Sequence, residues 1–575
     1  MRLLFCLALF VAPIIGLAQS RPNVVILLVD DGGFMDFGGY GGEAATPNIN
    51  RIADQGVRFS NYHTSPLCAP SRAMLLTGLD NHRTGVGTIP EVITDAQEGE
   101  KAYALSLLPE VDTIADRLKA AGYQTFMTGK WHLGRAEGDL PNHHGFDRSF
   151  TLDASGADNW EQRSYMPYYD EAPWFEDGAP AILPEDFYSS RFFIEKLIEY
   201  LEARDRSKPF FSYVGFQAIH IPIQAPQAFI DRYEGVFSDG WDLLRDQRFE
   251  RAKALGLVPE NAAPPVPHPS LRSWESLSEE EKQHYETSMM VNAGMIEAMD
   301  HYIGQLVDYL ETEGELDNTV FVITSDNGPE FNDPSTNAAF MQWASQNDYH
   351  IDMEQPGGIG YLGAIGTEWA SAAAVPGSLY KMYATEGGTR VPMMISGPGV
   401  PRVEGFNSAL NFVIDVAPTI AEMAGVESQG MDGRSLLPLL TGDAESVYGA
   451  EDEIGLEVAG NAALFKGDFK LTRNTRPHGD FVWRLFNVRV DPAESSDLSG
   501  EMPELKAEML AAYKAFEVEY GVVAVPEEFN IVDQIRSNTA AVVFKRNLST
   551  ILLSAFGFLL VLVAAMLFIR RRRSN

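Results

Sequence analysis

The sequence predicts an α/β fold with a large, mixed or mostly parallel sheet flanked by helices, followed by a smaller antiparallel domain. Apolar runs of strand length alternate with helix-like stretches over most of the chain, which is typical of parallel α/β proteins. Residues 23–29 are apolar after the first position and rich in β-branched side chains, as expected for a strand buried on both faces. From residues 430–446 onward, short amphipathic strands replace this pattern.

The remaining elements follow from periodicity and from the residues at their ends. Residues 47–55 follow Thr46 and are predicted as a helix, and Gly122 ends another helix at 112–121. The α/β domain is assigned to residues 21–445 and the small domain to residues 446–520. Further strands are expected at 123–127, 209–216 and 319–324, and further helices at 190–204 and 276–314; in the small domain, strands are expected at 462–465, 469–473 and 481–486, and a helix at 503–520.

The two ends of the chain resemble targeting segments. Residues 1–20 have a positive start at Arg2, an apolar stretch and small residues for cleavage, which predicts a secretory signal, with an uncleaved anchor as the alternative. Residues 549–569 are uncharged and are followed by four arginines, which predicts a single C-terminal transmembrane helix. The heavier positive flank would leave residues 570–575 as a cytoplasmic tail. Residues 521–548 would then be a stalk.

This arrangement predicts an exported, membrane-anchored protein whose catalytic domain is periplasmic or extracellular. A buried core helix and a tail that is cleaved during surface sorting are the alternatives for the C-terminal segment. The 80 acidic and 44 basic residues give a formal net charge of −36, which excludes general nucleic-acid binding. Any site for an anion must therefore concentrate cations locally inside a cleft.

Polar residues collect after several of the predicted strands, where open α/β sheets bind ligands. Asp30 and Asp31 end the first strand, and Asp326 and Asn327 follow another. Adjacent carboxylates repel unless a cation lies between them, and an all-oxygen set suits Ca²⁺, with Mg²⁺ less favoured. The alternative is that both pairs simply form turns.

Three further basic segments are less informative alone. Lys130 and His132 would share one face if the preceding strand stayed extended, which suits an anionic substrate, but a solvated Lys and a loop His explain them equally well. His220 lies among apolar residues and Lys381 beside tyrosines, so each could be an ordinary core or surface residue.

Cys68 is chemically unusual for an exported chain. The only other cysteine, Cys6, lies in the predicted signal, so no internal disulfide can form. A small buried apolar role is the ordinary alternative. Pro70 suits the first turn of a helix that Gly78 ends, which places Cys68 at a helix N-terminus that favours an anionic centre. Arg72 would face the same side one turn later.

The segment from Cys68 to Arg72, Cys-Ala-Pro-Ser-Arg, followed by Thr77 and Gly78, resembles the sulfatase signature. In that family, which belongs to the alkaline phosphatase superfamily, the cysteine is oxidised to formylglycine. The resemblance covers about residues 21–520 and is greatest to bacterial arylsulfatases. Matching segments occur in the family order: 23–31, 45–49, 129–134, 325–328 and 386–390.

The resemblance implies an alkaline-phosphatase-like α/β domain, a small antiparallel C-terminal domain and a role for each site residue. Cys68 matches the aldehyde precursor and a metal ligand, and Arg72 the residue that holds it. His132 and His220 match the catalytic histidines. Lys130 and Lys381 match the sulfate-binding lysines, and Asp30, Asp31, Asp326 and Asn327 match the calcium ligands.

The implied activity is hydrolysis of sulfate esters through a formylglycine hydrate and a covalent sulfo-enzyme intermediate. The implied partners are a small aryl sulfate or sulfated carbohydrate and a formylglycine-generating or sulfatase-maturating enzyme. Two alternatives remain at this point: a phosphonate or phosphate ester hydrolase of the same superfamily, and a non-catalytic surface binding protein that keeps Cys68 as a thiol.

Overall fold

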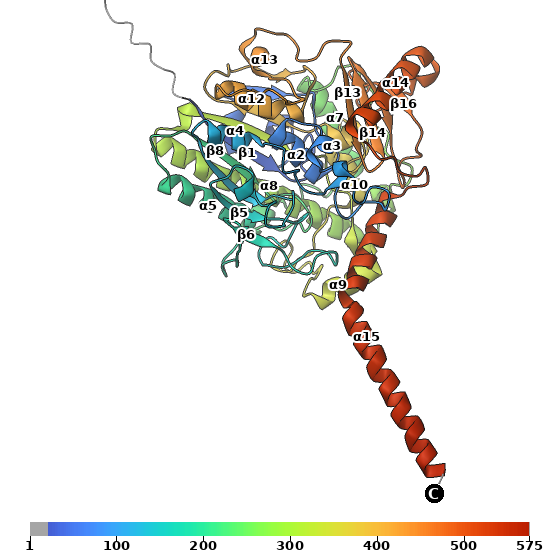
Figure 1. The fold of residues 1–575 in the computed structure, drawn as a ribbon. Coiled ribbons are helices and arrows are strands. Elements are labelled where there is room, and N and C mark those ends of the chain that lie inside the picture. The colour runs from blue at the N-terminus through green and yellow to red at the C-terminus, as the bar shows by residue number, and fades with distance from the viewer. Residues whose placement is uncertain (1–20, 574–575) are drawn as a thin grey trace, which may run out of the picture.

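The centre of the molecule is a ten-stranded sheet (Figure 1). The structure, a computed structural model, describes residues 21–573, and from residue 549 onward it describes only some of the side chains. The five central strands are mutually parallel and almost entirely buried, as expected for a sheet covered on both faces. In spatial order they are β9 (Thr319–Ser325), β1 (Asn23–Val29), β8 (Phe210–Gly215), β4 (Gln124–Lys130) and β5 (Arg148–Leu152).

Antiparallel strands at the two edges make the whole sheet mixed. Strand β10 (Met393–Ser396) runs antiparallel to both β9 and β2 (Gly56–Phe59), and β11 (Phe406–Asn407) continues this edge. At the other edge β6 (Trp174–Glu176) pairs antiparallel with β5, and β7 (Ala179–Pro180) pairs antiparallel with β6. The sheet is therefore mixed with a parallel centre, in agreement with the predicted mixed or mostly parallel sheet.

Helices cover both faces of this sheet, in two groups of mutually packed helices. The longest, α8 (Glu279–Thr312), begins with a capping box in which Ser278 and Glu281 satisfy each other's backbone N–H groups. One group comprises α1 (Pro47–Ala53), α5 (Ser189–Ala203) and α8; the other comprises α2 (Cys68–Thr77), α4 (Ile114–Ala120) and α12 (Val416–Met423). Smaller elements are β3 (Tyr62–His63), β12 (Asn411–Phe412), α3 (Asn81–Thr84), α6 (Gln227–Ile230), α7 (Gly240–Ala254), α9 (Ala338–Gln346), α10 (Gly366–Ala373), α11 (Glu386–Thr389) and α13 (Leu437–Thr441).

A four-stranded antiparallel sheet lies beside the large one, as the sequence predicts (Figure 1). Helix α14 (Pro503–Tyr520) covers it, and Met509, Tyr513 and Phe516 pack on the apolar face of the strands. The strands, which pair in chain order, are β13 (Glu453–Val458), β14 (Asn461–Lys466), β15 (Phe469–Arg473) and β16 (Arg484–Asn487). The domain boundaries proposed from the sequence stay a prediction.

The C-terminal helix differs from its prediction. Within the described part of the chain, no helix combines the length and the apolar character that a bilayer crossing requires, so the expected transmembrane helix at 549–569, and with it the C-terminal membrane anchor, is wrong. The segment belongs instead to α15 (Ile531–Arg573), which projects from the body in Figure 1. Its first turns carry Asp533, Arg536 and Lys545, because the helix begins well before the apolar run. The predicted signal, residues 1–20, lies outside the described residues.

Candidate active site

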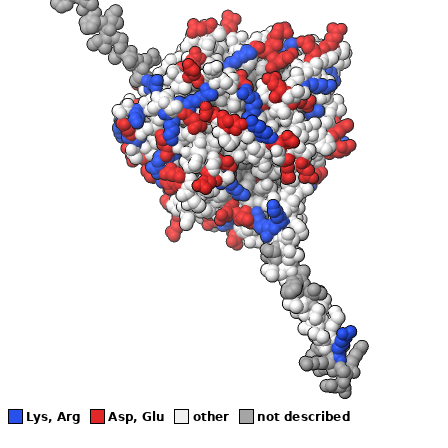
Figure 2. Space-filling view, viewed as in Figure 1, with Lys and Arg blue, Asp and Glu red and all other residues white. Residues whose placement is uncertain are grey.

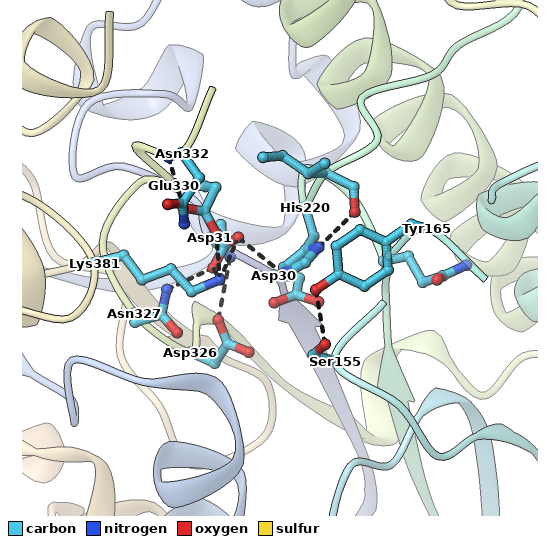
Figure 3. Close-up of polar contacts among 12 residues, drawn as sticks. Asp30, Asp31, Ser155, Tyr165, His220, Asp326, Asn327, Glu330, Asn332 and Lys381 are labelled. Carbon is cyan, nitrogen blue, oxygen red and sulfur yellow. Dashed lines mark hydrogen bonds and ion pairs between the residues drawn. The ribbon is translucent and has the colours of Figure 1, made fainter. Parts of the chain in front are cut away.

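The acidic residues that follow β1 and β9 lie side by side. These strands pair in parallel with Val29 opposite Ser325, so the residues just beyond them meet at one edge of the sheet (Figure 3). The Asp31 backbone N–H donates to Asp326 Oδ1 at 3.2 Å, and Asn327 Nδ2 donates to Asp31 Oδ1 at 2.6 Å. Asp31 adopts a positive φ of 65°, a strained conformation for a side-chain-bearing residue that is common at functional sites.

Cys68 is the first residue of α2, as the sequence predicts, and it is completely buried. Burial raises the pKa of the Cys68 thiol, against the charges of Lys130 and Lys381, which lower it. The thiol is therefore protonated at neutral pH despite its place at a helix N-terminus. Because the thiolate is the reactive form, an unmodified Cys68 is a poor nucleophile.

Arg72 lies one helical turn beyond Cys68 and joins three elements. Its Nε donates to Asp326 Oδ2 at 2.9 Å, and its Nη1 donates to the carbonyl oxygen of Lys130 at 2.8 Å. Gly215 at the end of β8 makes this contact possible, because a Cβ there would lie 2.9 Å from Arg72 Nη1. The arginine thus fixes α2 to the ends of β4 and β9.

The Lys130 ammonium lies inside the acidic cluster, whereas His132 points elsewhere than expected. Lys130 Nζ is 2.6 Å from Asp30 Oδ2. Strand β4 ends at Lys130, and His132 has a φ of 59°, so the extended geometry that would align the two side chains does not persist. Among the described residues neither ring nitrogen of buried His132 has a hydrogen-bond partner. Burial, with the charges of Lys130 and Arg72, lowers the His132 pKa well below its usual value.

Lys381 contacts Asp31 in the cluster, together with Glu330, which the sequence analysis missed. Lys381 Nζ lies 2.8 Å from Asp31 Oδ1 and 2.9 Å from Glu330 Oε2 (Figure 3). Burial opposes the charge on Lys381, but Asp31 and Glu330 hold its pKa well above the usual value. Burial raises the pKa of Glu330, but the charge of Lys381 outweighs this effect and lowers the Glu330 pKa to about 2. The position of Glu330, three residues after Asn327, was the one feature of the sequence that could have pointed to its place in the site.

His220 faces the same cluster. Its Nδ1 lies 2.7 Å from the carbonyl oxygen of Ile221, and its Nε2 lies 3.7 Å from Asp31 Oδ2. Tyr165 packs edge-on against the ring at 5.3 Å, and its hydroxyl is 2.8 Å from Ser155 Oγ. Burial and the charge of Lys381 lower the His220 pKa well below its usual value. Nothing in the sequence pointed to Ser155 or Tyr165.

The predicted metal ligands are compatible with a cation. Ligand atoms of Asp30, Asp31, Cys68 and Asp326 lie within 4.8 Å of one another. Asp30 Oδ1 and Asn327 Oδ1 are buried without a hydrogen-bond partner among the described residues, a costly arrangement that a cation would relieve. Burial and the nearby carboxylates Asp30, Glu330 and Asp326, opposed by Lys381, raise the pKa of Asp31 to about 8. The donor set of hard oxygens suits Ca²⁺ or Mg²⁺.

The structure thus brings the predicted site residues together from segments up to 350 positions apart. Among them His132 is near the cluster, but its ring makes no hydrogen bond within the described part of the chain. A protein-family model described as Sulfatase matches residues 22–426. The chain belongs to the sulfatase family. An arylsulfatase of Klebsiella aerogenes is 35% identical, over 73% of this chain and 91% of the relative. An uncharacterized sulfatase of Schizosaccharomyces pombe is 34% identical, over 89% of this chain and 96% of the relative.

Solved structures show the same fold. The crystal structure of Ps i-CgsB has a TM-score of 0.61 and 23% identity, covering 86% of this chain and 93% of that one. The structure of BT4656 in complex with its substrate D-glucosamine-2-N,6-O-disulfate has a TM-score of 0.58 and 23% identity, covering 87% and 98%. The fold of this sulfatase is therefore the alkaline-phosphatase-like α/β fold with a C-terminal antiparallel sheet, and the protein is an enzyme that hydrolyses sulfate esters.

Proposed function

We propose that this sulfatase is of the arylsulfatase type and uses a formylglycine made from Cys68, together with a bound Ca²⁺. The environment of Cys68 Sγ is the observation that carries the proposal. The thiol is buried beside Asp30, Asp326 and Lys130 and is held in its protonated form. A neutral thiol does not suit attack on sulfur. The aldehyde hydrate supplies one hydroxyl that attacks sulfur and a second that lets sulfate leave as the aldehyde re-forms.

The metal would be held by Asp30, Asp31, Asp326 and Asn327, with residue 68 completing the set. When bound, the ion supplies positive charge that acidifies the nucleophile and stabilises the sulfuryl oxygens. Charge balance favours its presence. Without it, the four carboxyl groups of the cluster face three cations, and the raised pKa of Asp31 reflects how unfavourable a fourth buried negative charge is there. A bound cation would let all four ionise and would add positive charge to attract an anionic sulfate ester. The side chains counted are Asp30, Asp31, Asp326 and Glu330 against Arg72, Lys130 and Lys381.

The buried cations bind and orient the sulfate group. Arg72, fixed to Asp326 and to the Lys130 carbonyl, holds residue 68 in place. Lys130 and Lys381 neutralise the sulfuryl oxygens as charge develops on them, and burial makes each interaction stronger than it would be in water.

The two histidines move protons. His132 is neutral, and in the described part of the chain neither of its ring nitrogens has a hydrogen-bond partner, so it can accept the proton of the second hydroxyl. His220 directs Nε2 into the site because Nδ1 donates to the Ile221 carbonyl. The neutral His220 carries its proton on Nδ1 and none on Nε2. The proton for the oxygen of the departing alcohol or phenol therefore comes from Lys381, which stays protonated, either directly or relayed through His220 Nε2.

Mass spectrometry of the peptide that contains residue 68 tests the proposal directly. The active enzyme should carry an aldehyde or its hydrate at this position. Cys68→Ser should show almost no turnover, because a single hydroxyl could be sulfated but could not eliminate sulfate. Full sulfatase activity from a chain with an unmodified thiol or serine at residue 68 would overturn the mechanism. Faster hydrolysis of matched aryl phosphates or phosphonates than of aryl sulfates would contradict the substrate assignment.

A further inference from the structure

The first turns of α15 form a wall of the cavity above the site. This cavity has a volume of about 860 Å³, and its lining includes Cys68, His220 and Lys381 at one end. Such a volume is in the range of pockets that enclose a small molecule. The lining residues from α15 recur every three or four positions, as one face of a helix does; they are Val532, Ile535, Arg536, Thr539, Ala540 and Val543.

Hydrogen bonds fix α15 in this position. Asn538 Nδ2 donates to the Glu91 carbonyl at 3.0 Å, and Gln534 Nε2 donates to the Ile93 carbonyl at 3.0 Å. Farther along, Arg546 donates to the carbonyls of Pro167 and Tyr168 at 3.1 and 2.8 Å. The two loops that α15 binds also contribute to the cavity, through Ile89, Glu91, Tyr165, Met166 and Pro167. The helix and the walls it completes are therefore one packed unit.

Most of the surface that lines the cavity is apolar. Phe331, Phe340, Trp343, Met166 and Met382 contribute apolar side chains to the lining, and polar residues such as Arg272, Asp333 and Glu368 also line it. Apolar walls gain free energy by covering apolar ligand surface, whereas each sugar hydroxyl placed against them would lack a hydrogen-bond partner, which is costly.

The negative charge of the protein also favours a compact, apolar ligand with a single sulfate over a polysulfated chain. The formal net charge is −36, and acidic side chains are spread among the basic ones on the face seen in Figure 2. A polysulfated chain would bring many negative charges to such a surface and be repelled. A compact ester with one sulfate brings only the charge that the catalytic cations bind.

We propose that this cavity holds the leaving group of the substrate, and that α15 selects sulfate monoesters of a large apolar phenol or alcohol. The inference rests on the proposed hydrolysis of sulfate esters at residue 68. It assigns specificity to a helix that lies outside the catalytic domain predicted from the sequence, with Val532, Ile535 and Val543 as the residues that contact the leaving group.

The test is a series of phenyl, 4-butylphenyl and 4-octylphenyl sulfates assayed with the matured full-length enzyme. The alkyl chain hardly changes the acidity of the phenol, so differences in kcat/KM report contacts to the chain. A methylene that becomes fully buried is worth about fourfold, so kcat/KM should rise by roughly two- to fourfold per carbon along the series. A flat or falling series would overturn the proposal.

Variants of α15 locate the contact. Ile535→Asp places a charge in the apolar wall and Ala540→Trp fills the cavity, so both should abolish the gain from the octyl chain, measured within each variant as the ratio of kcat/KM for the octyl and phenyl esters. Phe544→Asp is the matched control, because Phe544 is 59% exposed on the same helix and does not line the cavity. Should Ile535→Asp fail to fold, Ala540→Trp carries the test. An unchanged octyl preference in Ala540→Trp would refute a role for α15.

Two outcomes separate this inference from the proposed function. If no sulfate ester is hydrolysed by a chain with formylglycine at residue 68, the proposed function itself fails. If phenyl sulfate is hydrolysed but a monosulfated oligosaccharide is a better substrate than 4-octylphenyl sulfate, only the inference about the leaving group fails.

Discussion

His82 offers a stability test that is independent of catalysis. The ring is completely buried between two carboxylates, with Nδ1 3.0 Å from Asp80 Oδ1 and Nε2 3.0 Å from Glu457 Oε2. Glu457 belongs to β13, so the imidazolium links the α/β core to the small antiparallel sheet. Replacing the residue in His82→Gln removes the charge and keeps a polar side chain of similar reach.

The size of the effect follows from the His82 pKa. Burial lowers this pKa, but hydrogen bonds and charge from Asp80 and Glu457 raise it from 6.5 to about 9. At 1.36 kcal/mol per pH unit, this difference corresponds to about 3 kcal/mol. Since the pKa is raised in the folded state, the stabilisation is fully present below about pH 6.5 and is lost as pH rises through about 9.

The assay is thermal unfolding of wild type and His82→Gln across this pH range. The Tm of the variant should lie several degrees below wild type at low pH, and the difference should close above about pH 9. His301→Gln, at an exposed histidine of α8, should show no such pH-dependent difference. A Tm gap between wild type and His82→Gln that is constant with pH would refute the buried imidazolium.

Two further predictions concern the active site. Glu330→Gln should lower kcat/KM by about tenfold or more with the fold retained, because Lys381 loses one of two carboxylates that orient it. The exposed control Glu354→Gln should keep wild-type rates. Equal rates in both variants would contradict a role for Glu330 in orienting Lys381. Chelation should lower activity and Tm, and added Ca²⁺ should restore them. Because the metal-free Asp31 pKa is about 8, the ion must displace a proton below that pH. Its affinity, measured by calorimetry, should rise by up to about tenfold per pH unit until about pH 8; a pH-independent affinity there would contradict the ligand assignment.

Local pattern was enough to predict much of the site. The β1 strand is recognisable from its apolar run, and parallel strands place Asp30 and Asp326 at one edge of the sheet. Pro70 and Gly78 bracket a helix in the sequence, so the position of Cys68 at its start needed no tertiary information. Residue spacing alone did not show that Lys130, His220 or Lys381 were more than ordinary basic residues.

Two predictions made from local sequence alone were wrong: the membrane-spanning helix and the shared direction of the Lys130 and His132 side chains. Hydropathy suggested a membrane span at 549–569, but in the described residues no helix is both long and apolar enough for one. His132 lost its expected alignment with Lys130 because the chain turns at the end of β4.

The sequence by itself determined the kind of chemistry: the fold class, the helix that begins at Cys68 and the acidic strand ends are all encoded within short segments. Tertiary structure alone decided the electrostatic state and the shape of the site. The protonated thiol of Cys68, the pairing of Glu330 with Lys381 and the wall formed by α15 arise from segments that are distant in the chain. Burial and charge act through space, so they become defined only when packing brings these segments together.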